Sequence, residues 1–511
     1  MNVRRFLLGA LLSLATLPNL TIAKDVSQPS EAATAFARIS DDPLLLYMAL
    51  KQMPKGADLH NHLAGTPFAE NYLEWAAADG MCVDPQTSDL APSPCAKEQT
   101  VAAIAVDRPF VYGRLIDRLS ARGWLQGVDS DEASGHTQFF SSFDRFFAVA
   151  VRHYAPTMMV ALRDAAADRV VYLELMHNPL ALSRYIASGA GQVDRSDLAA
   201  FYKAEQPRLG PMVAAARAEL DQDEAEVREG LGCATDTPDP ACRVATHYLA
   251  SAMRAHEPEH VFRSLIGAFA LADADPRYVG INIVMPEDWA PSLRDYDLHM
   301  AMIGYLASVY PKVRLTLHAG ELAPGLVPPA DMRDHIKKAI DAGAERIGHG
   351  TAIAYEDDAA GTLKRMARDG IAVEINLTSN AVILGVSGPD HPLNLYRRYG
   401  VPVTLSTDDQ GVLRSNLTQE YVRAVREQGL GYEDLKQVSR AGLEYGFVPG
   451  ESLWISGRVG TPVGDCAKSL ETAACTALVA RSEKARLQVA LESELKRFEQ
   501  ILVGIAVGKG A

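Results

Sequence analysis

Short apolar runs with the alternation of β-strands recur along the middle of the chain, separated by stretches with the period of an amphipathic helix. The candidate strands cover residues 57–63, 170–176, 244–253, 278–284, 313–318, 346–349, 371–376 and 401–407. Ala-, Arg- and Glu-rich helical stretches such as 332–342 and 361–369 lie between most of them. Because parallel strands need crossover helices, this repeated unit predicts an α/β fold, a (β/α)₈ TIM barrel.

The barrel pattern extends over residues 54–450, and the segments outside its repeat predict additional helices. Residues 24–53 form a helical N-terminal lead. An insertion at about 64–169 follows the first strand, and a second insertion at 194–243 contains the acidic run 221–229, expected to be a solvated helix face. Residues 451–511 carry a disulfide loop and, over 477–505, one long C-terminal helix packed on the outside of the barrel.

The N-terminal residues have the order of a secretory signal peptide, which we assign to residues 1–23. Arg4 and Arg5 precede the apolar run 6–17, and small residues at 21–23 form a cleavage site, so the mature chain starts near Lys24. A membrane anchor is the alternative, but the apolar run is shorter than the roughly 20 residues that cross a bilayer. We therefore expect an exported protein, periplasmic or extracellular, without a stable membrane anchor.

The cysteines of the chain fall into local couples. Each couple brackets a polar stretch rich in Pro, Asp, Thr or Ala, such as residues 234–241, which is typical of a surface loop. In an oxidising compartment these spacings predict loop-closing disulfides, although other pairings stay open. A thiolate metal site is disfavoured because the chain has no Cys-x-x-Cys pair. The couples are Cys82 with Cys95, Cys233 with Cys242, and Cys466 with Cys475.

Composition narrows the class of partner. The chain has 511 residues, 48% of them hydrophobic, so it can bury a large core. Its formal net charge of −14 leaves no basic surface to neutralise a phosphate backbone. Nucleic acid and anionic membranes are disfavoured as main partners, whereas small uncharged molecules fit.

Histidines and carboxylates cluster at the C-terminal ends of the predicted strands. His60 and His62 lie two positions apart on the first strand, so both side chains face the lumen. His318 ends another strand, and the chain turns at Gly320 so that Glu321 returns over the barrel mouth. As core residues, two inward imidazoles would each need a buried polar partner, which makes a metal site an equal alternative.

The same face receives residues from two further strands. His349 is flanked by glycines that allow close backbone approach, and Asp408 and Asp409 end a β-rich run. Singly, the histidines could be core residues, Glu321 a helix cap and the aspartates a turn. Jointly they occupy the face on which barrel enzymes place their sites. Three imidazoles and one carboxylate suit Zn²⁺ with an open position for water, whose pKa the metal lowers.

These motifs resemble the adenosine deaminase family, including its secreted growth-factor-related branch. The resemblance extends over about residues 55–450, with its motifs in order. It is carried by His60-Asn61-His62, Leu317-His318-Ala319-Gly320-Glu321, Ile347-Gly348-His349-Gly350, Leu377-Thr378-Ser379-Asn380, His391-Pro392-Leu393, Ser406-Thr407-Asp408-Asp409 and Glu420-Tyr421.

The resemblance implies a hydrolase that converts adenosine or 2′-deoxyadenosine to the inosine product and ammonia. It implies one Zn²⁺ per chain, held by His60, His62, His318 and Asp408. Glu321 would protonate purine N1, His349 would take or orient the proton of the attacking water, and Asp409 would form a hydrogen bond involving N7. Hydrolytic loss of ammonia from an aromatic amidine needs a nucleophile, a proton on the ring nitrogen and stabilisation of a tetrahedral intermediate, which a metal hydroxide, a carboxylic acid and an imidazole supply. Because Glu321 must be protonated to act, we expect its pKa to be raised.

Two positions depart from the family pattern and bear on the substrate. Where the family has an acidic residue near the ribose 5′-hydroxyl, this chain has Ala64. Where a glycine approaches purine N3, this chain has Met285 or Pro286, and a proline cannot donate a backbone hydrogen bond. The sequence therefore supports deamination of a 6-aminopurine more strongly than of adenosine itself.

Other functions stay open as alternatives. A deaminase of another aminopurine or cyclic amidine would use the same residues. A two-metal hydrolase is disfavoured because the fourth strand has no bridging lysine, and an AMP deaminase because no basic cluster lies near the motifs. A non-catalytic purine-binding or signalling protein would have no need for a proton donor such as Glu321 beside a metal.

Overall fold

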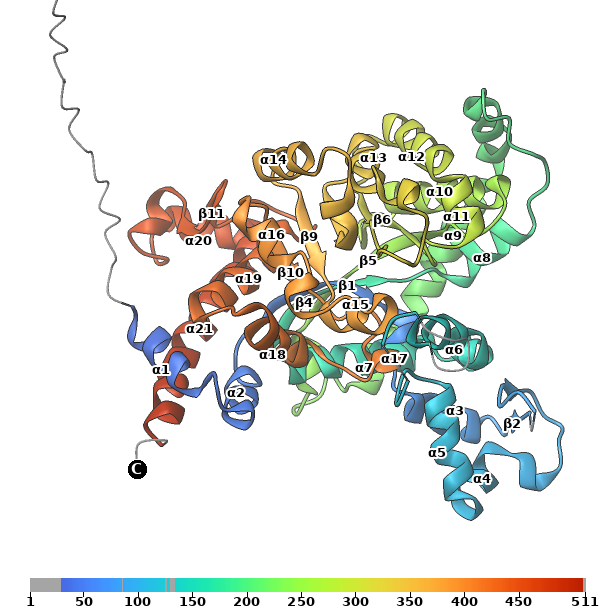
Figure 1. The fold of residues 1–511 in the computed structure, drawn as a ribbon, viewed down its shortest axis with the longest axis horizontal. Coiled ribbons are helices and arrows are strands. Elements are labelled where there is room, and N and C mark those ends of the chain that lie inside the picture. The colour runs from blue at the N-terminus through green and yellow to red at the C-terminus, as the bar shows by residue number, and fades with distance from the viewer. Residues whose placement is uncertain (1–28, 85, 125, 129–133, 509–511) are drawn as a thin grey trace, which may run out of the picture.

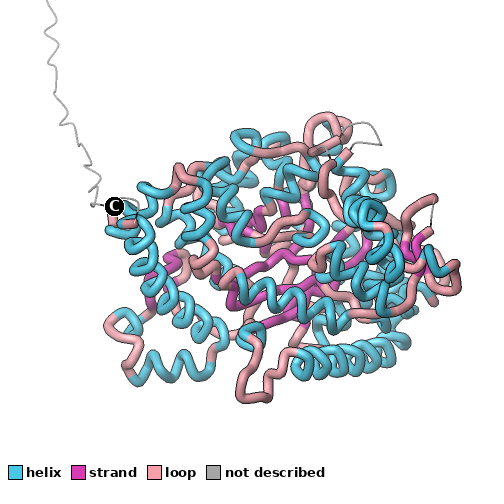
Figure 2. The backbone as a smooth tube through the Cα atoms, turned by 90° about the horizontal axis from the view of Figure 1, so that it is seen from below, coloured by secondary structure: helices cyan, strands magenta, loops and turns pink. Residues whose placement is uncertain are grey.

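The computed structural model describes residues 29–84, 86–124, 126–128 and 134–508. The signal peptide predicted over 1–23 lies outside the described residues. Strands occupy the centre and helices surround them (Figure 2). The main strands form two four-stranded parallel sheets, ordered β1-β4-β5-β6 and β10-β9-β8-β7. They are β1 (Gly56–His62), β4 (Val170–Met176), β5 (Ala245–Met253), β6 (Tyr278–Val284), β7 (Thr316–Ala319), β8 (Arg346–His349), β9 (Ala372–Ile375) and β10 (Val403–Leu405).

The two sheets meet at both of their edges. A parallel bridge joins Asn61 at the end of β1 to Asp408 after β10, with the backbone hydrogen bonds His62 N to Asp408 O at 3.0 Å and Asp408 N to His60 O at 2.9 Å. A second parallel bridge joins Ile281 on β6 to Leu315 before β7. The predicted α/β class with parallel strands is therefore confirmed, and the carboxyl ends of β1 and β10 lie side by side.

The predicted strands match the observed ones closely. β4, β6 and β8 have the predicted bounds, whereas the others differ by one to three residues at an end. β10 begins at Val403 rather than at residue 401 because Pro402 has no N–H to donate to the ladder. The Pro402 carbonyl instead accepts a hydrogen bond from Val373 N at 2.9 Å.

Helices follow the strands as crossovers. α14 illustrates how the sequence forms such a helix. The Asp358 side chain caps its start by accepting from Gly361 N at 3.1 Å, Leu363 and Met366 are its buried residues, and Gly370 ends it with φ 69°. The helices between and after the main strands are α8 (Leu180–Ala187), α9 (Leu198–Gly230), α10 (Pro258–Ala274), α11 (Ala290–Arg294), α12 (Tyr296–Val309), α13 (His335–Asp341), α14 (Ala359–Asp369), α15 (Leu377–Leu384), α16 (Leu393–Arg398), α17 (Gln410–Leu413), α18 (Leu417–Gln428) and α19 (Tyr432–Tyr445).

The insertion after β1 is mainly helical and also contains a short hairpin that the sequence pattern did not predict. The hairpin is tied to the following loop by the Cys82–Cys95 disulfide. In Figure 1 the first helices of this insertion and the hairpin extend away from the body of the molecule, whereas its helix α6 lies against α15. The elements are α3 (Ala69–Ala78), β2 (Cys82–Val83), β3 (Leu90–Ala91), α4 (Val101–Asp107), α5 (Pro109–Arg118), α6 (Gly135–Ala150) and α7 (Tyr154–Ala167).

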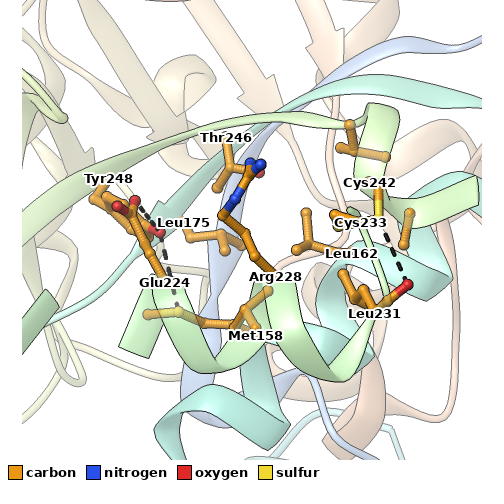
Figure 3. Close-up of a pocket in the computed structure, with 13 residues that line it drawn as sticks. Met158, Leu162, Leu175, Glu224, Arg228, Leu231, Cys233, Cys242, Thr246 and Tyr248 are labelled. Carbon is orange, nitrogen blue, oxygen red and sulfur yellow. Dashed lines mark hydrogen bonds between the residues drawn. A yellow bond between two sulfur atoms is a disulfide. The ribbon is translucent and has the colours of Figure 1, made fainter. Parts of the chain in front are cut away.

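The second insertion is built on the 33-residue helix α9, which continues through two prolines. The acidic run at its end lies on a largely exposed helix face, as predicted. Glu224 within it is half-buried and accepts hydrogen bonds from Tyr248 and Arg277 at 3.1 and 2.8 Å. The Cys233–Cys242 disulfide closes the loop beyond it. A cavity of about 240 Å³ lies there, and Figure 3 shows its lining side chains. None of them belongs to the predicted metal and catalytic site.

The two ends of the described chain pack together. α1 (Glu31–Ile39) lies against α21 (Glu483–Val507), and α2 (Pro43–Leu50) against α18. The single C-terminal helix predicted over 477–505 is wrong, because Ser482 separates α20 (Ala473–Arg481) from α21. Its side chain accepts from Ala485 N at 3.0 Å as an N-cap and donates to Glu451 O at 2.6 Å.

A small antiparallel pair precedes these last helices. It consists of β11 (Trp454–Ile455) and β12 (Arg458–Pro462), and the Cys466–Cys475 disulfide joins the loop after β12 to α20. All the predicted cysteine couples are thus bonded as expected. Among the described residues, no helix combines the length and apolarity required to span a bilayer.

Candidate active site

Three histidines and one aspartate meet where β1, β7 and β10 end. His62 Nε2 lies 3.1 Å from Asp408 Oδ1 and 3.3 Å from His318 Nε2, and His60 Nε2 lies 3.4 Å from Asp408 Oδ1. One ligand atom from each of these residues falls within 4.8 Å of the others. The structure therefore brings together all the residues that the sequence proposed as metal ligands.

The donor atoms of this group fit a divalent metal ion. His60 Nε2 is buried and has no hydrogen-bond partner among the described residues. The Nε2 atoms of His62 and His318 face each other beside a carboxylate oxygen, so several lone pairs converge on one point. A cation at that point would satisfy them all, and a set of nitrogen and oxygen ligands suits Zn²⁺ among the common metals.

The orientation of two imidazoles is set by buried partners behind them. Glu374 Oε2 accepts from His60 Nδ1 at 2.7 Å, and Asn282 Oδ1 accepts from His318 Nδ1 at 2.9 Å. With Nδ1 occupied in this way, the Nε2 lone pair of each ring faces the candidate metal site. Sequence reasoning missed both partners. A polar residue inside an otherwise apolar strand, as at Glu374 in β9, was the available signal.

Glu374 is part of a buried ionic network. Its Oε1 accepts hydrogen bonds from Thr316 Oγ1 at 2.6 Å and from Arg346 Nε, and Arg346 also pairs with Glu174. Burial alone would raise the pKa of Glu374, but Arg346 and the His60 hydrogen bond outweigh it and lower that pKa to about 2. The carboxylate that orients His60 is therefore ionised over the working range of pH.

Glu321 faces the same opening, as predicted. The chain turns at Gly320, whose φ is 70°, and Glu287 accepts the N–H groups of Gly320 and Glu321 at 3.1 and 2.9 Å. Burial, followed by the charge of Asp408, raises the pKa of Glu321 well above its ordinary value. The buried Arg254 Nη2 lies 4.0 Å from Glu321 Oε2. A buried carboxyl group whose pKa is shifted toward the protonated form thus lies beside the candidate metal site.

His349 lies between Glu321 and the metal ligands. Its Nδ1 is 3.7 Å from Glu321 Oε1, and its Nε2 is 4.0 Å from Asp408 Oδ2. His349 has φ 63° and Asp408 has φ 59°, a strained backbone region for non-glycine residues that is often found at functional sites. Gly348 beside it has room for no side chain, because a Cβ there would lie 2.7 Å from His60 Cε1.

Asp409 completes the predicted set. Its side chain lies over Gly65, where an added Cβ would come within 1.7 Å of Asp409 Oδ1. That oxygen is buried and has no partner among the described residues. The carboxyl group is therefore available to a ligand that enters the site.

The two departures from the family pattern have distinct structural outcomes. Ala64 brings no carboxylate to the site, and its carbonyl accepts a hydrogen bond from Tyr72 OH at 2.7 Å. Met285 has φ 81°, a conformation that suits glycine, and its carbonyl accepts from Arg254 Nε at 2.7 Å. Arg254 was not predicted from the sequence, and it links the ends of β5, β6 and β7.

Comparison with known proteins finds a matching family model and sequence relatives. The family model described as Adenosine deaminase matches residues 128–453, so His60 and His62 lie before the matched segment. An adenine deaminase from Sinorhizobium medicae is 28% identical over 226 residues, which are 43% of this chain and 63% of that relative. The chain thus spans less than two thirds of that relative's length.

Two solved structures share the fold. An Arabidopsis N6-mAMP deaminase superposes with a TM-score of 0.51 at 21% identity, over 78% of this chain and 95% of that one. An amidohydrolase from Burkhoderia ambifaria with bound Zn superposes with a TM-score of 0.50 at 18% identity, over 92% of this chain and 97% of that one. With the family match extending over more than half of its residues, the chain belongs to the adenosine deaminase family.

Proposed function

We propose that this protein is a zinc-dependent hydrolase that deaminates a 6-aminopurine nucleoside, adenosine or 2′-deoxyadenosine, to the inosine product and ammonia. The observation that carries the proposal is the convergence of His60, His62, His318 and Asp408, with the buried Glu321, whose pKa burial raises, beside them. A purine-binding protein without catalysis would gain nothing from an acid in that place.

Zn²⁺ is the metal that the ligand set supports best. Three imidazoles and a carboxylate match its preferred donors, and the zinc-bound amidohydrolase with the same fold is consistent with this choice. Bound there, Zn²⁺ would lower the pKa of a water molecule and supply a nucleophile at neutral pH.

The protein's own groups would carry the protons of the reaction. Burial keeps a proton on Glu321, and its transfer to purine N1 makes C6 electrophilic while the water oxygen bonds to C6. The C6–N6 bond then breaks as the amino group takes up one proton of the attacking water and leaves as ammonia, and the other water proton returns Glu321 to its acid form. Arg254 Nη2 lies where it can stabilise the carboxylate that Glu321 becomes. His349 is placed to hydrogen-bond the attacking oxygen, and Asp409, whose pKa is raised by burial and by the charge of Asp408, to donate a hydrogen bond to purine N7.

A second substrate class is favoured by two observations. The positions that would contact the ribose and the N3 edge of the purine carry Ala64 and the backbone-strained Met285. Relatives of the same fold are named as adenine deaminase and N6-mAMP deaminase. The alternative is therefore a deaminase of another aminopurine or cyclic amidine, with the same metal and acid residues.

Ultraviolet monitoring of the purified protein tests the proposal. Adenosine, 2′-deoxyadenosine, adenine, AMP and N6-methyl-AMP are compared as substrates, with the metal content measured on the same samples. We expect turnover of a nucleoside, one zinc per chain, and loss of activity in Glu321→Gln. Turnover of adenine alone would replace the nucleoside assignment. Bound zinc without turnover of any of these compounds would contradict the deaminase proposal.

The barrel and the cellular location belong to the same proposal. The parallel bridges at Asn61 and Ile281 support closure of the two sheets into one (β/α)₈ barrel. The predicted signal at residues 1–23 and the three disulfides support export to an oxidising compartment. Cell fractionation tests this location, and a mature chain found only in the cytoplasm would contradict it.

A further inference from the structure

We propose that Asn380 and His391 are positioning residues that fix the tautomer of His349, with its hydrogen on Nε2. In this form His349 donates a hydrogen bond to an oxygen in the active site and cannot act there as a base. The inference deepens the proposed deaminase function and rests on it. It also gives a role to two sequence motifs, 377–380 and 391–393, that the metal site and the acid leave unused.

The assignment starts from a donor whose role is unambiguous. The backbone N–H of Leu393, at the start of α16, donates to His391 Nδ1 at 3.1 Å. Nδ1 of His391 therefore carries no hydrogen. His391 is 3% exposed, and burial lowers its pKa to about 3, so the ring is neutral. The hydrogen of a neutral ring without one on Nδ1 must be on Nε2.

The hydrogen on His391 Nε2 fixes the orientation of the Asn380 amide. His391 Nε2 lies 3.0 Å from Asn380 Oδ1, and a donor requires an acceptor at that position, which the amide oxygen supplies. The amide nitrogen then points the other way, where Asn380 Nδ2 lies 3.0 Å from His349 Nδ1. Asn380 is completely buried, so no solvent competes for either contact. The network thus assigns the amide orientation as well as the tautomer.

The contact between Asn380 and His349 fixes the position of the hydrogen on the His349 ring. Because Asn380 Nδ2 donates, His349 Nδ1 accepts, and the hydrogen of the neutral ring lies on Nε2. That nitrogen is 4.0 Å from Asp408 Oδ2, on the side of the metal ligands. Asn376 Nδ2 lies 3.4 Å from His349 Nδ1, where it donates in the same sense as Asn380. Its distance to His349 Nε2 is 3.5 Å, at the limit of a hydrogen bond, so the 3.0 Å contact of Asn380 decides the tautomer. His349 Nε2 is therefore a donor toward an oxygen bound near Asp408.

Substitution of Asn380 by Asp reverses the network without changing its shape. A carboxylate can only accept, so it takes hydrogens from both His391 Nε2 and His349 Nδ1, and His349 Nε2 becomes an acceptor. We expect kcat to fall roughly 100-fold or more, with KM within about 3-fold of the wild-type value, because positioned hydrogen donors act mainly in the transition state. The matched control is Asn394→Asp, which is expected to keep its kcat. Asn394 is a partly buried amide on the neighbouring helix α16, and its hydrogen bonds go to Gln428 and Arg397.

A second pair of variants covers the case in which Asn380→Asp prevents folding. His391→Gln keeps an amide N–H for Asn380 Oδ1, and we expect its kcat to stay within about 3-fold of wild type. His391→Leu removes that donor, so the side-chain amide of Asn380 can flip, and we expect kcat to fall at least about 10-fold. A loss of activity that is equal in both variants would show that His391 serves packing alone and would overturn the proposal.

Nitrogen-15 NMR of the histidine rings gives a readout that does not depend on turnover. In the zinc-loaded wild type, the ring assigned to His349 by its absence in His349→Gln is expected to carry its hydrogen on Nε2, and in Asn380→Asp on Nδ1. A hydrogen on Nδ1 in the wild type would overturn the proposal. A wild-type chain that deaminates no purine would contradict the proposed function, while the NMR result would still decide the tautomer.

Discussion

Replacing Glu374 by Gln tests whether the buried network sets the metal affinity. In the wild type, the two carboxylate oxygens accept from three donors, His60 Nδ1, Thr316 Oγ1 and Arg346 Nε. A glutamine has one acceptor oxygen, so its amide N–H group must face one of these donors and break that contact. Arg346 would also keep only Glu174 as its carboxylate partner.

Two quantities follow from this geometry. A partner that orients a metal-binding histidine is worth about 10- to 100-fold in metal affinity, or about 1.4 to 2.8 kcal/mol. Removing one member of a buried ionic group costs about 3–5 kcal/mol of folding free energy. Because Arg346 keeps Glu174 as a partner, we expect a loss at the low end, about 3 kcal/mol. Zinc affinity is measured by competition with a chelator, and stability by urea unfolding of the metal-free protein.

A matched control is available at the surface. Glu345 pairs with Arg314, and their side chains are 44% and 39% exposed. Glu345→Gln removes the same charge and is expected to change stability by less than about 1 kcal/mol and to leave zinc affinity unchanged. If Glu374→Gln lost stability but bound zinc as tightly as the wild type, Glu374 would serve Arg346 alone, and the claim that it orients His60 would be refuted.

Three further predictions concern other parts of the structure. Gly348→Ala places a Cβ 2.7 Å from His60 Cε1, so the ring must move, and metal analysis should find substoichiometric zinc; full occupancy would contradict the tight fit. The pKa of Glu287 is lowered to about 2, since Arg254 and the His335 hydrogen bond outweigh burial, so its contribution is present above about pH 4.5 and is lost toward pH 2. Urea unfolding at descending pH should show a decline in the free energy of unfolding that is about 3 kcal/mol smaller in Glu287→Gln than in the wild type, and equal declines would refute the assignment. Replacing Cys233 and Cys242 together by Ala opens a loop of sequence separation 9 and should cost about 2–3 kcal/mol of unfolding free energy; an unchanged urea midpoint would contradict it.

Local signals explain what could be predicted from the sequence. The strands at 170–176, 278–284 and 346–349 were predicted with their observed bounds because apolar alternation and flanking breakers are local properties. The cysteine couples were predicted because each closes a short polar loop. The tail was predicted as one helix because the helical period continues across Ser482, whose side chain caps α21 and donates to Glu451 O.

The residues of the site also fall into those that the sequence predicts and those that only the folded structure identifies. The sequence by itself predicted the candidate metal ligands together with Glu321 and His349, because each stands at the end of a strand and parallel strands bring their carboxyl ends to one face. Only the tertiary structure decided which groups hold these side chains: Glu374 lies 314 positions from His60 in the chain, and Asn282 lies 36 from His318. Such partners have no fixed sequence spacing, since a buried hydrogen bond requires only that the folded backbone bring donor and acceptor together.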